Sequence, residues 1–492
     1  MGFITNNKND LVITKKNDVY VHVKCERGIA MELSEHFTFE VPGAKFMPSY
    51  KGGFWDGKIR LFDTKTNLIY FGLRFELARF AESRGYKFSL FDNSIDIIKD
   101  DVNNFINHLK IPMKIRDYQL DAVHHAIKHS RALLVSPTAS GKSLIIYCLI
   151  RYYTFKQQKT NKKILLLVPT IQLVSQMFKD FNDYGFDAET NCHLITSGKD
   201  KYADKPIYIS TWQSVYKMKK DYFSQFSVVF VDEAHTAKAK SLSTIMEKLT
   251  NCPYRFGLTG TLDGKETNRL TLSGLFDVPK NVTTTKKLMD AGTIAKLKVN
   301  CLVLNHSKED KKIARNVKTY QEECDYLVLN KSRNLFISKL ATTLNGNTLV
   351  LFQYVEKHGI PLTEQIREMT DKEVLYVSGI TKADEREDIR EFAENTDDVI
   401  IVASNGTFST GINIRNIHNI IFAFPSKSQI RILQSIGRGL RTHNSKDVCN
   451  VYDIADDIRT GKKKNYTMNH FDERCNIYRD GEFNISINII NI

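Results

Sequence analysis

The stretch "ALLVSPTASGKSLIIYCLIRYY", residues 132–153, decides the fold class of this chain of 492 residues. The run Ala132–Val135 is short and apolar, as a buried strand is, and the apolar run after Ser143 has the length of a helix. The loop Ser136–Ser143 therefore ends in Gly-Lys-Ser at a helix N-terminus, where free N–H groups favour phosphate. We expect Lys142 to pair with the β- and γ-phosphates of a nucleotide and Ser143 to ligate Mg²⁺.

This loop departs from the usual G-x-x-x-x-G-K-[ST] pattern at its first position, where Ser136 replaces glycine. A Gly-Lys-Ser tripeptide by itself is common, so the loop alone leaves a chance match open. If the loop does cradle phosphates, its contacts with the nucleotide are Thr138, Ala139, Ser140, Gly141, Lys142 and Ser143.

A second apolar run, Phe226–Val231, is continuous and β-branched, which is typical of a parallel strand covered on both faces. It ends in Asp-Glu-Ala-His. Asp232 is predicted to hold Mg²⁺ through water, and Glu233 to polarise the attacking water. An acidic pair after a strand is more often a solvated loop when it stands alone. Together with the Gly-Lys-Ser loop, in order and after its own strand, it predicts a magnesium–nucleotide site.

Strand-like and helix-like stretches alternate from about Ile115 to about Asp457, which is the pattern of parallel α/β sheets. The strands form two sets, so we expect two doubly wound lobes with a hinge near Thr285. The first set is Ala132–Val135, Ile164–Val168, Pro206–Ile209, Phe226–Val231 and Phe256–Leu258. The second set is Lys298–Leu304, Thr348–Phe352, Glu373–Val377, Asp398–Val402, Asn419–Phe424 and Asn450–Ile454.

The residues before Ile115 have a different pattern of expected strands and helices from the α/β stretch that follows. Val19–Cys25 alternates like a half-exposed strand, and Gly72–Tyr86 has apolar residues at helical spacing, which together indicate a separate small α+β domain. The expected domains are residues 1–105 for this domain, 106–285 for the ATP-binding lobe, 286–460 for the second lobe and 461–492 for a short basic tail.

Composition narrows the class of partner. The net charge of +14 points to a polyanion, although charge alone does not separate nucleic acid from an anionic membrane. The eight cysteines are scattered without metal-ligand spacing, as reduced thiols in a reducing compartment would be. We expect no membrane span, because no apolar run approaches the ~20 residues that one needs.

The second lobe carries "QSIGRGLR" at Gln434–Arg441, where Gln434, Arg438 and Arg441 fall at helical spacing. Two arginines on one helix face are usually solvated. Because this lobe has no phosphate loop of its own, the pattern favours arginine fingers that reach the γ-phosphate bound by the first lobe.

The motifs of this chain, taken in order, resemble those of a known family. The motifs "RDYQ" (116–119), "SPTASGKS", "LVPT", "STWQS", "DEAH", "LTGTL", "LFQYVEKHG", "YVSG", "STGINI" and "QSIGRGLR" follow the order of a superfamily-two helicase core. The segments "FWDGKIRLFD" and "FGL" before that core make nearly the whole chain similar to the UvsW family of recombination helicases of T-even phages. The resemblance implies an α/β fold of two RecA-like doubly wound parallel-sheet lobes with a small N-terminal α+β domain.

The resemblance also implies roles for single residues. It implies adenine-side contacts for Tyr118 and Gln119, with Arg116 nearby, and a nucleotide contact for Gly411. It makes Lys142, Asp232, Glu233, Gln434, Arg438 and Arg441 the catalytic set. Coupling of hydrolysis to lobe movement falls to His235, Thr259, Thr261 and Gln434. The implied nucleic-acid path is Thr170, Thr211, Trp212, Ser378 and Thr410. By capping preference, hydroxyl residues just after strands are also ordinary helix caps.

By the same resemblance the N-terminal domain binds duplex DNA. Trp55, Lys58 and Arg60 combine a ring that can stack with two cations. The alternative is that Trp55 fills a small core, since tryptophans are usually largely buried.

Together with the motifs, the resemblance implies a monomeric ATP- and Mg²⁺-dependent DNA helicase that remodels branched, duplex and single-stranded DNA, and RNA–DNA hybrid at R-loops. It predicts a cytoplasmic location, in the bacterial host if a phage encodes it, and no membrane partner. Three alternatives stay open: an RNA helicase, a translocase subunit of a restriction complex, and a nucleotide-dependent binding switch.

Overall fold

The structure of the chain is a computed structural model. It describes residues 9–41, 43–158, 160–196, 198, 200–238, 240–262, 266–407, 414–424, 437, 448–459, 461 and 463–492.

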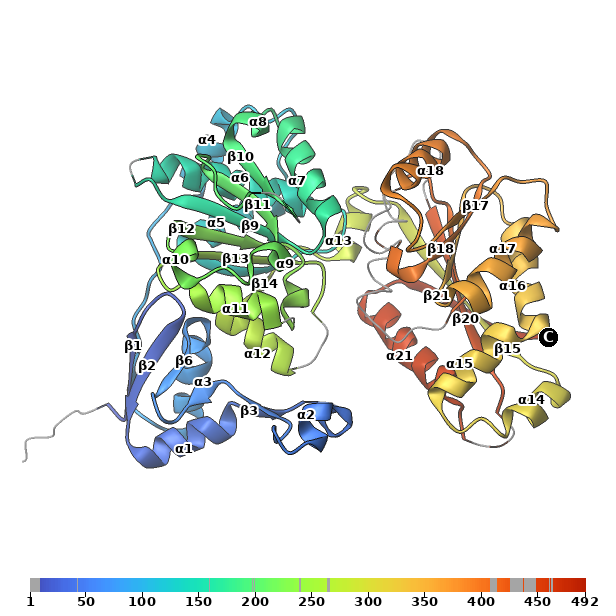
Figure 1. The fold of residues 1–492 in the computed structure, drawn as a ribbon, viewed down its shortest axis with the longest axis horizontal. Coiled ribbons are helices and arrows are strands. Elements are labelled where there is room, and N and C mark those ends of the chain that lie inside the picture. Colours follow the sequence, from blue (N-terminus) through green and yellow to red (C-terminus); the bar gives the residue numbers. More distant parts are fainter. Residues whose placement is uncertain are drawn as a thin grey trace, which may run out of the picture. The chain divides into compact units, whose positions relative to one another are not determined.

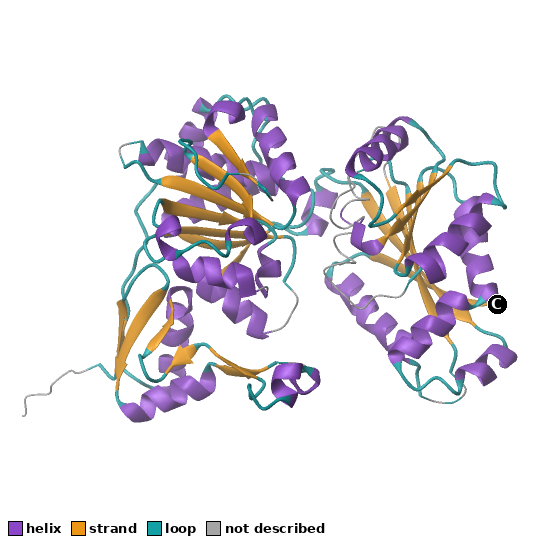
Figure 2. Cartoon of the chain, in the orientation of Figure 1, coloured by secondary structure: helices purple, strands orange, loops and turns teal. Residues whose placement is uncertain are grey.

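The chain divides into two compact units (Figure 1). The first consists of residues 1–136 and 141–282, and the second of residues 137–140 and 283–492. Each unit contains a parallel sheet with helices packed along it (Figure 2). Two parallel-sheet lobes and an N-terminal α+β domain are the predicted fold class, which is confirmed.

The N-terminal domain belongs to the first unit and is built on a mixed five-stranded sheet of order β5-β6-β2-β1-β7. Its sheet strands are β1 (Leu11–Lys15), β2 (Tyr20–Cys25), β5 (Phe62–Asp63), β6 (Leu68–Tyr70) and β7 (Phe88–Ser89). Its sheet packs with α1 (Arg27–His36), η2 (Phe71–Leu73) and α3 (Arg74–Arg84) around an apolar core that includes Leu33, Ile69 and Leu77.

A two-stranded ribbon of this domain stands apart from the five-stranded sheet. β3 (Thr38–Glu40) pairs with β4 (Lys58–Arg60), and the segment between them carries η1 (Ala44–Phe46) and α2 (Pro48–Lys51). In Figure 1 the ribbon carries α2 outward from the rest of the domain. We call the described residues of 38–60 the arm.

The N-terminal domain is joined to the first lobe through buried polar contacts. Arg131, which begins the first strand of that lobe, is 1% exposed and donates to the carbonyls of Asp18, Leu275 and Phe276 at 2.8–3.0 Å. The lobe's backbone packs directly against Gly72, where a side chain would not fit, because a Cβ there would lie 1.9 Å from the carbonyl oxygen of Ser273. Removing the whole domain would therefore expose part of the lobe's interior, which makes changes in the arm a cleaner probe of DNA binding than truncation.

The first lobe has a seven-stranded parallel sheet of order β10-β11-β9-β12-β13-β8-β14. Its strands are β8 (Arg131–Val135), β9 (Lys163–Val168), β10 (Cys192–Ile195), β11 (Ile207–Thr211), β12 (Phe226–Val231), β13 (Tyr254–Thr259) and β14 (Pro279–Asn281). Its helices are α4 (Lys99–His108), α5 (Asp117–His129), α6 (Lys142–Gln157), α7 (Ile171–Asp183), α8 (Ala188–Asn191), α9 (Trp212–Val215), α10 (Lys220–Phe223), η3 (Ala234–Lys238), α11 (Lys240–Lys248) and α12 (Glu266–Leu275).

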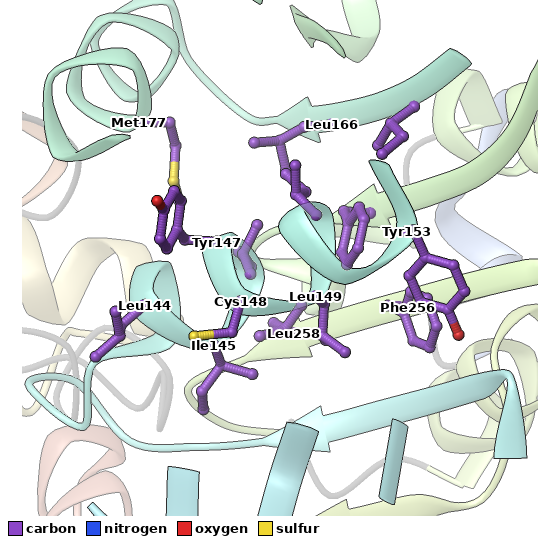
Figure 3. Packing of buried hydrophobic residues seen from close by; sticks show 14 of the residues in the cluster. Leu144, Ile145, Tyr147, Cys148, Leu149, Tyr153, Leu166, Met177, Phe256 and Leu258 are labelled. Carbon is purple, nitrogen blue, oxygen red and sulfur yellow. The ribbon is translucent and has the colours of Figure 1, made fainter. Parts of the chain in front are cut away.

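Helix α6 is apolar around most of its circumference because it lies inside the lobe. Tyr147, Cys148 and Leu149 are fully buried, and Figure 3 shows them among side chains from β9, α7 and β13. A helix that is hydrophobic on all sides is stable only when covered on all sides. This packing holds the helix start at Lys142 in a defined position.

The second lobe repeats this architecture with a seven-stranded parallel sheet of order β17-β18-β16-β19-β20-β15-β21. Its strands are β15 (Lys296–Asn305), β16 (Thr348–Phe352), β17 (Val374–Val377), β18 (Ile400–Ser404), β19 (Asn419–Phe422), β20 (Val448–Asp457) and β21 (Asn484–Asn491). Its helices are α13 (Thr285–Asp290), α14 (Lys308–Ala314), α15 (Tyr320–Leu329), α16 (Lys331–Thr343), η4 (Val355–Gly359), α17 (Ile360–Arg367), α18 (Ala383–Asn395) and α21 (Tyr466–Asp480).

The final segment, residues 461–492, is not a basic tail. It forms helix α21 and strand β21, and β21 pairs in parallel with β15 from Lys298↔Asn484 to Asn305↔Asn491. The three lysines at 462–464 suggested a solvated tail, but the alternating "NISINIIN" that follows is an edge strand with one face outward.

All eight cysteines lie in the described part of the chain, where no disulfide joins them and seven are buried. No helix of the described residues has the length and apolar character needed to cross a bilayer.

Candidate nucleotide site and nucleic-acid contacts

The loop after β8 is built as a phosphate loop. Its first N–H, at Ser136, donates to the carbonyl of Thr259 at the end of β13, 2.8 Å away. Ala139 and Gly141 both have positive φ, +65° and +80°, a conformation that turns the backbone sharply before a helix. Gly141 is also required sterically, since a Cβ there would lie 2.3 Å from the side-chain nitrogen of Gln119.

Lys142 and Ser143 follow at the start of α6, as predicted. The Lys142 ammonium donates to the carbonyl of Ser136 at 3.3 Å and lies 3.9 Å from a carboxylate oxygen of Glu233. The Ser143 hydroxyl is 2.9 Å from the hydroxyl of Tyr184. Sequence reasoning missed Tyr184, because nothing in the sequence marks a residue at the end of α7 as a neighbour of the phosphate loop.

Asp232 and Glu233 follow β12 at the same edge of the sheet. Asp232 is 4% exposed, and its Oδ1 has no hydrogen-bond partner among the described residues. Burial, and then the neighbouring charge of Glu233, raise the pKa of Asp232 to about 7, while the charge of Lys142 opposes the shift. A buried carboxylate oxygen without a partner is costly unless a ligand completes it. Asp232 thus fits a site for a cation.

Glu233 adopts a left-handed φ of +50°, an unusual conformation for a residue other than glycine. His235 lies 3.3 Å from its carboxylate and 2.9 Å from the hydroxyl of Thr259, which in turn donates to the carbonyl of Thr261 at 2.9 Å. Glu233, His235, Thr259 and Thr261 are therefore connected by polar contacts. These contacts link the acidic motif to the strand that also holds Ser136.

The predicted adenine-side residues lie next to this loop. The side-chain oxygen of Gln119 accepts from the N–H of Arg116 at 2.9 Å, and the guanidinium of Arg116 donates to the hydroxyl of Tyr118 at 2.9 Å. Tyr118 lines a cavity of about 370 Å³ between α5 and β14, together with His125 and Lys280. The hydrogen bonds thus connect Arg116, Tyr118 and Gln119, and Gln119 lies against Gly141 of the phosphate loop.

Two residues of the predicted nucleic-acid path, Trp212 and Ser378, have buried side chains in this structure. Trp212 is 4% exposed and packs in the core of the first lobe with Leu167 and Phe223. Ser378 is fully buried, whereas the neighbouring Ile380 is 87% exposed. Alternation along a strand end does not tell from sequence which side chain turns inward.

Thr170 and Thr211, the two threonines of that path that the structure describes, make local hydrogen bonds. Thr170 caps α7, since its hydroxyl accepts from the N–H of Leu173 at 3.3 Å. The Thr211 hydroxyl lies 2.9 Å from that of Ser214. The capping alternative therefore describes Thr170 in this structure.

Trp55, Lys58 and Arg60 all lie on the arm. Trp55 is half-buried and donates its indole N–H to the carbonyl of Lys58 at 2.8 Å. Arg60 is exposed and hydrogen-bonded to Asp56, with one contact of 3.2 Å, and this hydrogen bond lowers the pKa of Asp56 to about 2. Lys58 is exposed. Trp55 thus braces the arm.

Thr410, Gly411, Gln434, Arg438 and Arg441 lie outside the described residues.

Known families match three parts of the chain. Residues 10–92 match "DNA helicase UvsW, N-terminal", residues 112–264 match "Type III restriction enzyme, res subunit", and residues 330–443 match "Helicase conserved C-terminal domain". Among curated proteins, "ATP-dependent DNA helicase uvsW" of Enterobacteria phage T4 is 37% identical over 96% of this chain and 98% of its own length. The chain belongs to the UvsW helicase family.

The chain is also similar to a solved structure and to a second curated protein. A solved structure, "The crystal structure of T4 UvsW", is 34% identical with a TM-score of 0.52, covering 98% of this chain and 99% of that one. "DNA 3'-5' translocase XPB2" of Sulfurisphaera tokodaii is 26% identical over 69% of this chain and 82% of its own. As a UvsW-family protein with both helicase lobes, the chain is an ATP-dependent DNA helicase.

Proposed function

We propose that this helicase remodels branched DNA in recombination and repair: it regresses forks, migrates Holliday junctions and unwinds R-loops. The observation that carries the proposal is the similarity to phage T4 UvsW along nearly the whole chain, N-terminal domain included. Phage recombination and repair act on branched intermediates, and a helicase with an added N-terminal domain can hold duplex while its lobes act on one strand.

The site supports Mg²⁺ as the cofactor of ATP. Ser143 and Asp232 are the two protein oxygens that would hold it, and the unpartnered Oδ1 of Asp232 favours that assignment. Such a cation would neutralise charge on the phosphates. Lys142 binds the phosphates, and Glu233 accepts the proton of the attacking water. Thr138, Ala139, Ser140 and Gly141 supply the loop, and Tyr118 and Gln119 lie on the adenine side.

On motif grounds the second lobe contributes Gln434, Arg438 and Arg441, with Gly411 on the nucleotide and Thr410 on the DNA strand. The arginines act as fingers that stabilise charge on the γ-phosphate. The protein works as a monomer on branched, duplex and single-stranded DNA, and on RNA–DNA hybrid. If a phage encodes it, it works in the cytoplasm of the bacterial host.

One experiment tests this function. ATP hydrolysis by the full chain is measured side by side with single-stranded DNA, duplex, four-way junction, RNA and RNA–DNA hybrid, with and without Mg²⁺. We expect the strongest stimulation by the junction, and none in Lys142→Ala, which lacks the phosphate cation.

Stimulation by RNA alone would overturn the proposal in favour of an RNA helicase. Nucleic-acid binding without stimulated hydrolysis would favour a nucleotide-dependent binding switch. Stimulation by the junction without its conversion in a gel assay would remove the branch-remodelling role.

A further inference from the structure

The arm is an ordered structure although it has almost no core. The N–H of Val41 donates to the carbonyl of Gly57 at 2.8 Å, the N–H of Phe54 to that of Ser49 at 3.0 Å, and Trp55 closes the base of the loop as described above. Among the described residues between β3 and β4, only Ala44 and Gly57 are buried. The hydrogen bonds therefore hold a defined shape that apolar burial alone could not maintain.

The arm holds large apolar side chains in solvent. Phe54 is 91% exposed and Phe46 is 70% exposed, and Met47 and Tyr50 are 41% and 42% exposed. Single exposed apolar residues are ordinary, but a group of them on one short projecting segment indicates a binding surface. Phe46 and Phe54 are thus mostly open to solvent in the described structure.

Glycines support two of these rings. A Cβ at Gly52 would lie 2.9 Å from two carbons of the Phe54 ring, and a Cβ at Gly57 would lie 3.1 Å from the Tyr50 ring. Each ring thus rests against bare backbone on one side. Such a ring is restrained in position while the rest of its surface stays open to a partner.

The arm also carries exposed cations. Lys45, Lys51 and Lys58 are exposed, and the Lys45 ammonium lies 5.4 Å from the centre of the Phe46 ring. The described residues of the arm include two acidic residues: Asp56, which is paired with Arg60, and Glu40, which lies opposite Lys58 in the β3–β4 ribbon. The surface is therefore apolar and positive at once, which suits a partner with flat apolar groups on a negatively charged backbone.

Single-stranded DNA has this chemistry, because its bases are unpaired, each offers a flat face on which an aromatic ring can stack, and each is followed by a phosphate. Duplex DNA offers the phosphates but hides the faces of its bases. A hydrophobic protein partner would use the apolar surface but gives no reason for the exposed lysines Lys45, Lys51 and Lys58 on the same arm. The charge and the exposed rings together favour an unpaired strand.

We propose that Phe46 and Phe54 of the arm stack on unpaired bases of DNA, while Lys45, Lys51 and Lys58 contact the adjoining phosphates. The proposal rests on the proposed function in that DNA is the substrate. It assigns this domain a contact with a single strand, in addition to the duplex contact implied by family resemblance, and it places Trp55 behind the contact as a support.

The test uses the full chain and a forked oligonucleotide with the fluorescent base 2-aminopurine at the first unpaired position. Four variants are compared: Phe54→Ala, Phe54→Leu, Phe54→Trp and the double change Phe46→Leu with Phe54→Leu. The matched control is Phe155→Ala, which removes a 65% exposed ring from α6 in the first lobe. Binding is followed by titration at two salt concentrations, and stacking by quenching of the probe.

We expect the wild-type chain and Phe54→Trp to quench the probe, and Phe54→Leu to lose quenching although it keeps the apolar volume. Affinity for the fork should fall about 10-fold in Phe54→Ala and further in the double variant, which is the scale of losing one or two base stacks. Phe155→Ala should bind as the wild type does.

Wild-type quenching and affinity in Phe54→Leu and Phe54→Ala would overturn the proposal. Retained binding in Phe54→Leu with loss in Phe54→Ala would also overturn it, because it would show apolar docking without stacking, as on a protein. If the wild-type chain itself showed no DNA-stimulated hydrolysis, the proposed function would fail, and the two failures are therefore distinguishable.

Discussion

Two buried aspartates, Asp456 in the second lobe and Asp232 in the first, differ in whether their carboxylates are paired. In the second lobe, Asp456 is fully buried and accepts from His306 at 2.9 Å and from Arg333 at 3.0 Å. In the first lobe, Asp232 is almost as buried, but its Oδ1 has no partner among the described residues. The two lobes thus have the same strand arrangement and different electrostatics at comparable depth.

The pKa values follow the same difference. Burial tends to raise the pKa of Asp456, but the charge of Arg333 and the hydrogen bond from His306 bring it below its ordinary value. Burial and Glu233 raise that of Asp232 to about 7. A paired carboxylate at this depth stabilises the fold, whereas an unpaired one costs stability and is retained for a ligand. The comparison assigns a structural role to Asp456 and a functional role to Asp232.

The largest effect should come from breaking the structural network. Arg333→Met leaves Asp456 buried without its guanidinium partner, which should lower the free energy of unfolding by about 3–5 kcal/mol. Urea denaturation at pH 7 measures it. A variant as stable as the wild type would contradict the structural role of the pair.

The next effect belongs to catalysis. Glu233→Gln keeps the shape of the side chain but removes the base, so turnover should fall by at least ~100-fold while ATP binding is kept. Steady-state hydrolysis and nucleotide titration measure the two separately. If turnover stayed near normal, Glu233 would leave the mechanism.

Asp232→Asn should change the free energy of unfolding of the nucleotide-free chain, and the size of this change should depend on pH. Because the pKa of Asp232 is raised to about 7 in the folded chain, its contribution is neutral at about pH 4 and becomes increasingly destabilising as pH rises towards 7. Compared with the wild type, the nucleotide-free variant should therefore gain stability on the order of 4 kcal/mol at pH 8 and little at pH 4. Urea denaturation at both pH values checks the sign, and a loss of stability at pH 8 would show that Asp232 is paired.

The smallest effect is expected for a partly exposed ion pair, which serves as the control for Arg333→Met. Lys372 and Asp398 form an ion pair of 2.9 Å in the second lobe, but the Asp398 side chain is 48% exposed. Solvent screens such a pair, so Lys372→Met should change the free energy of unfolding by less than about 1 kcal/mol. A change as large as that of Arg333→Met would show that burial does not separate the two pairs.

Much of the nucleotide site could be predicted from the sequence alone. Lys142, Ser143, Asp232 and Glu233 sit at strand or helix ends within short contiguous motifs. Apolar runs predicted most strands of both sheets, but not β10, β14 or β21. Local sequence predicts such features, because the backbone conformation of a turn depends mainly on neighbouring residues and a continuous apolar run must be buried whatever segment covers it.

The tertiary structure alone decided the rest. It buried Trp212 and Ser378, brought Tyr184 to Ser143, turned residues 461–492 into a helix and an edge strand, and left Phe54 in solvent. Each of these depends on which distant segment packs against the residue. The same tryptophan, phenylalanine or carboxylate can be core or surface, paired or unpaired, and only the contacts made by the folded chain determine which.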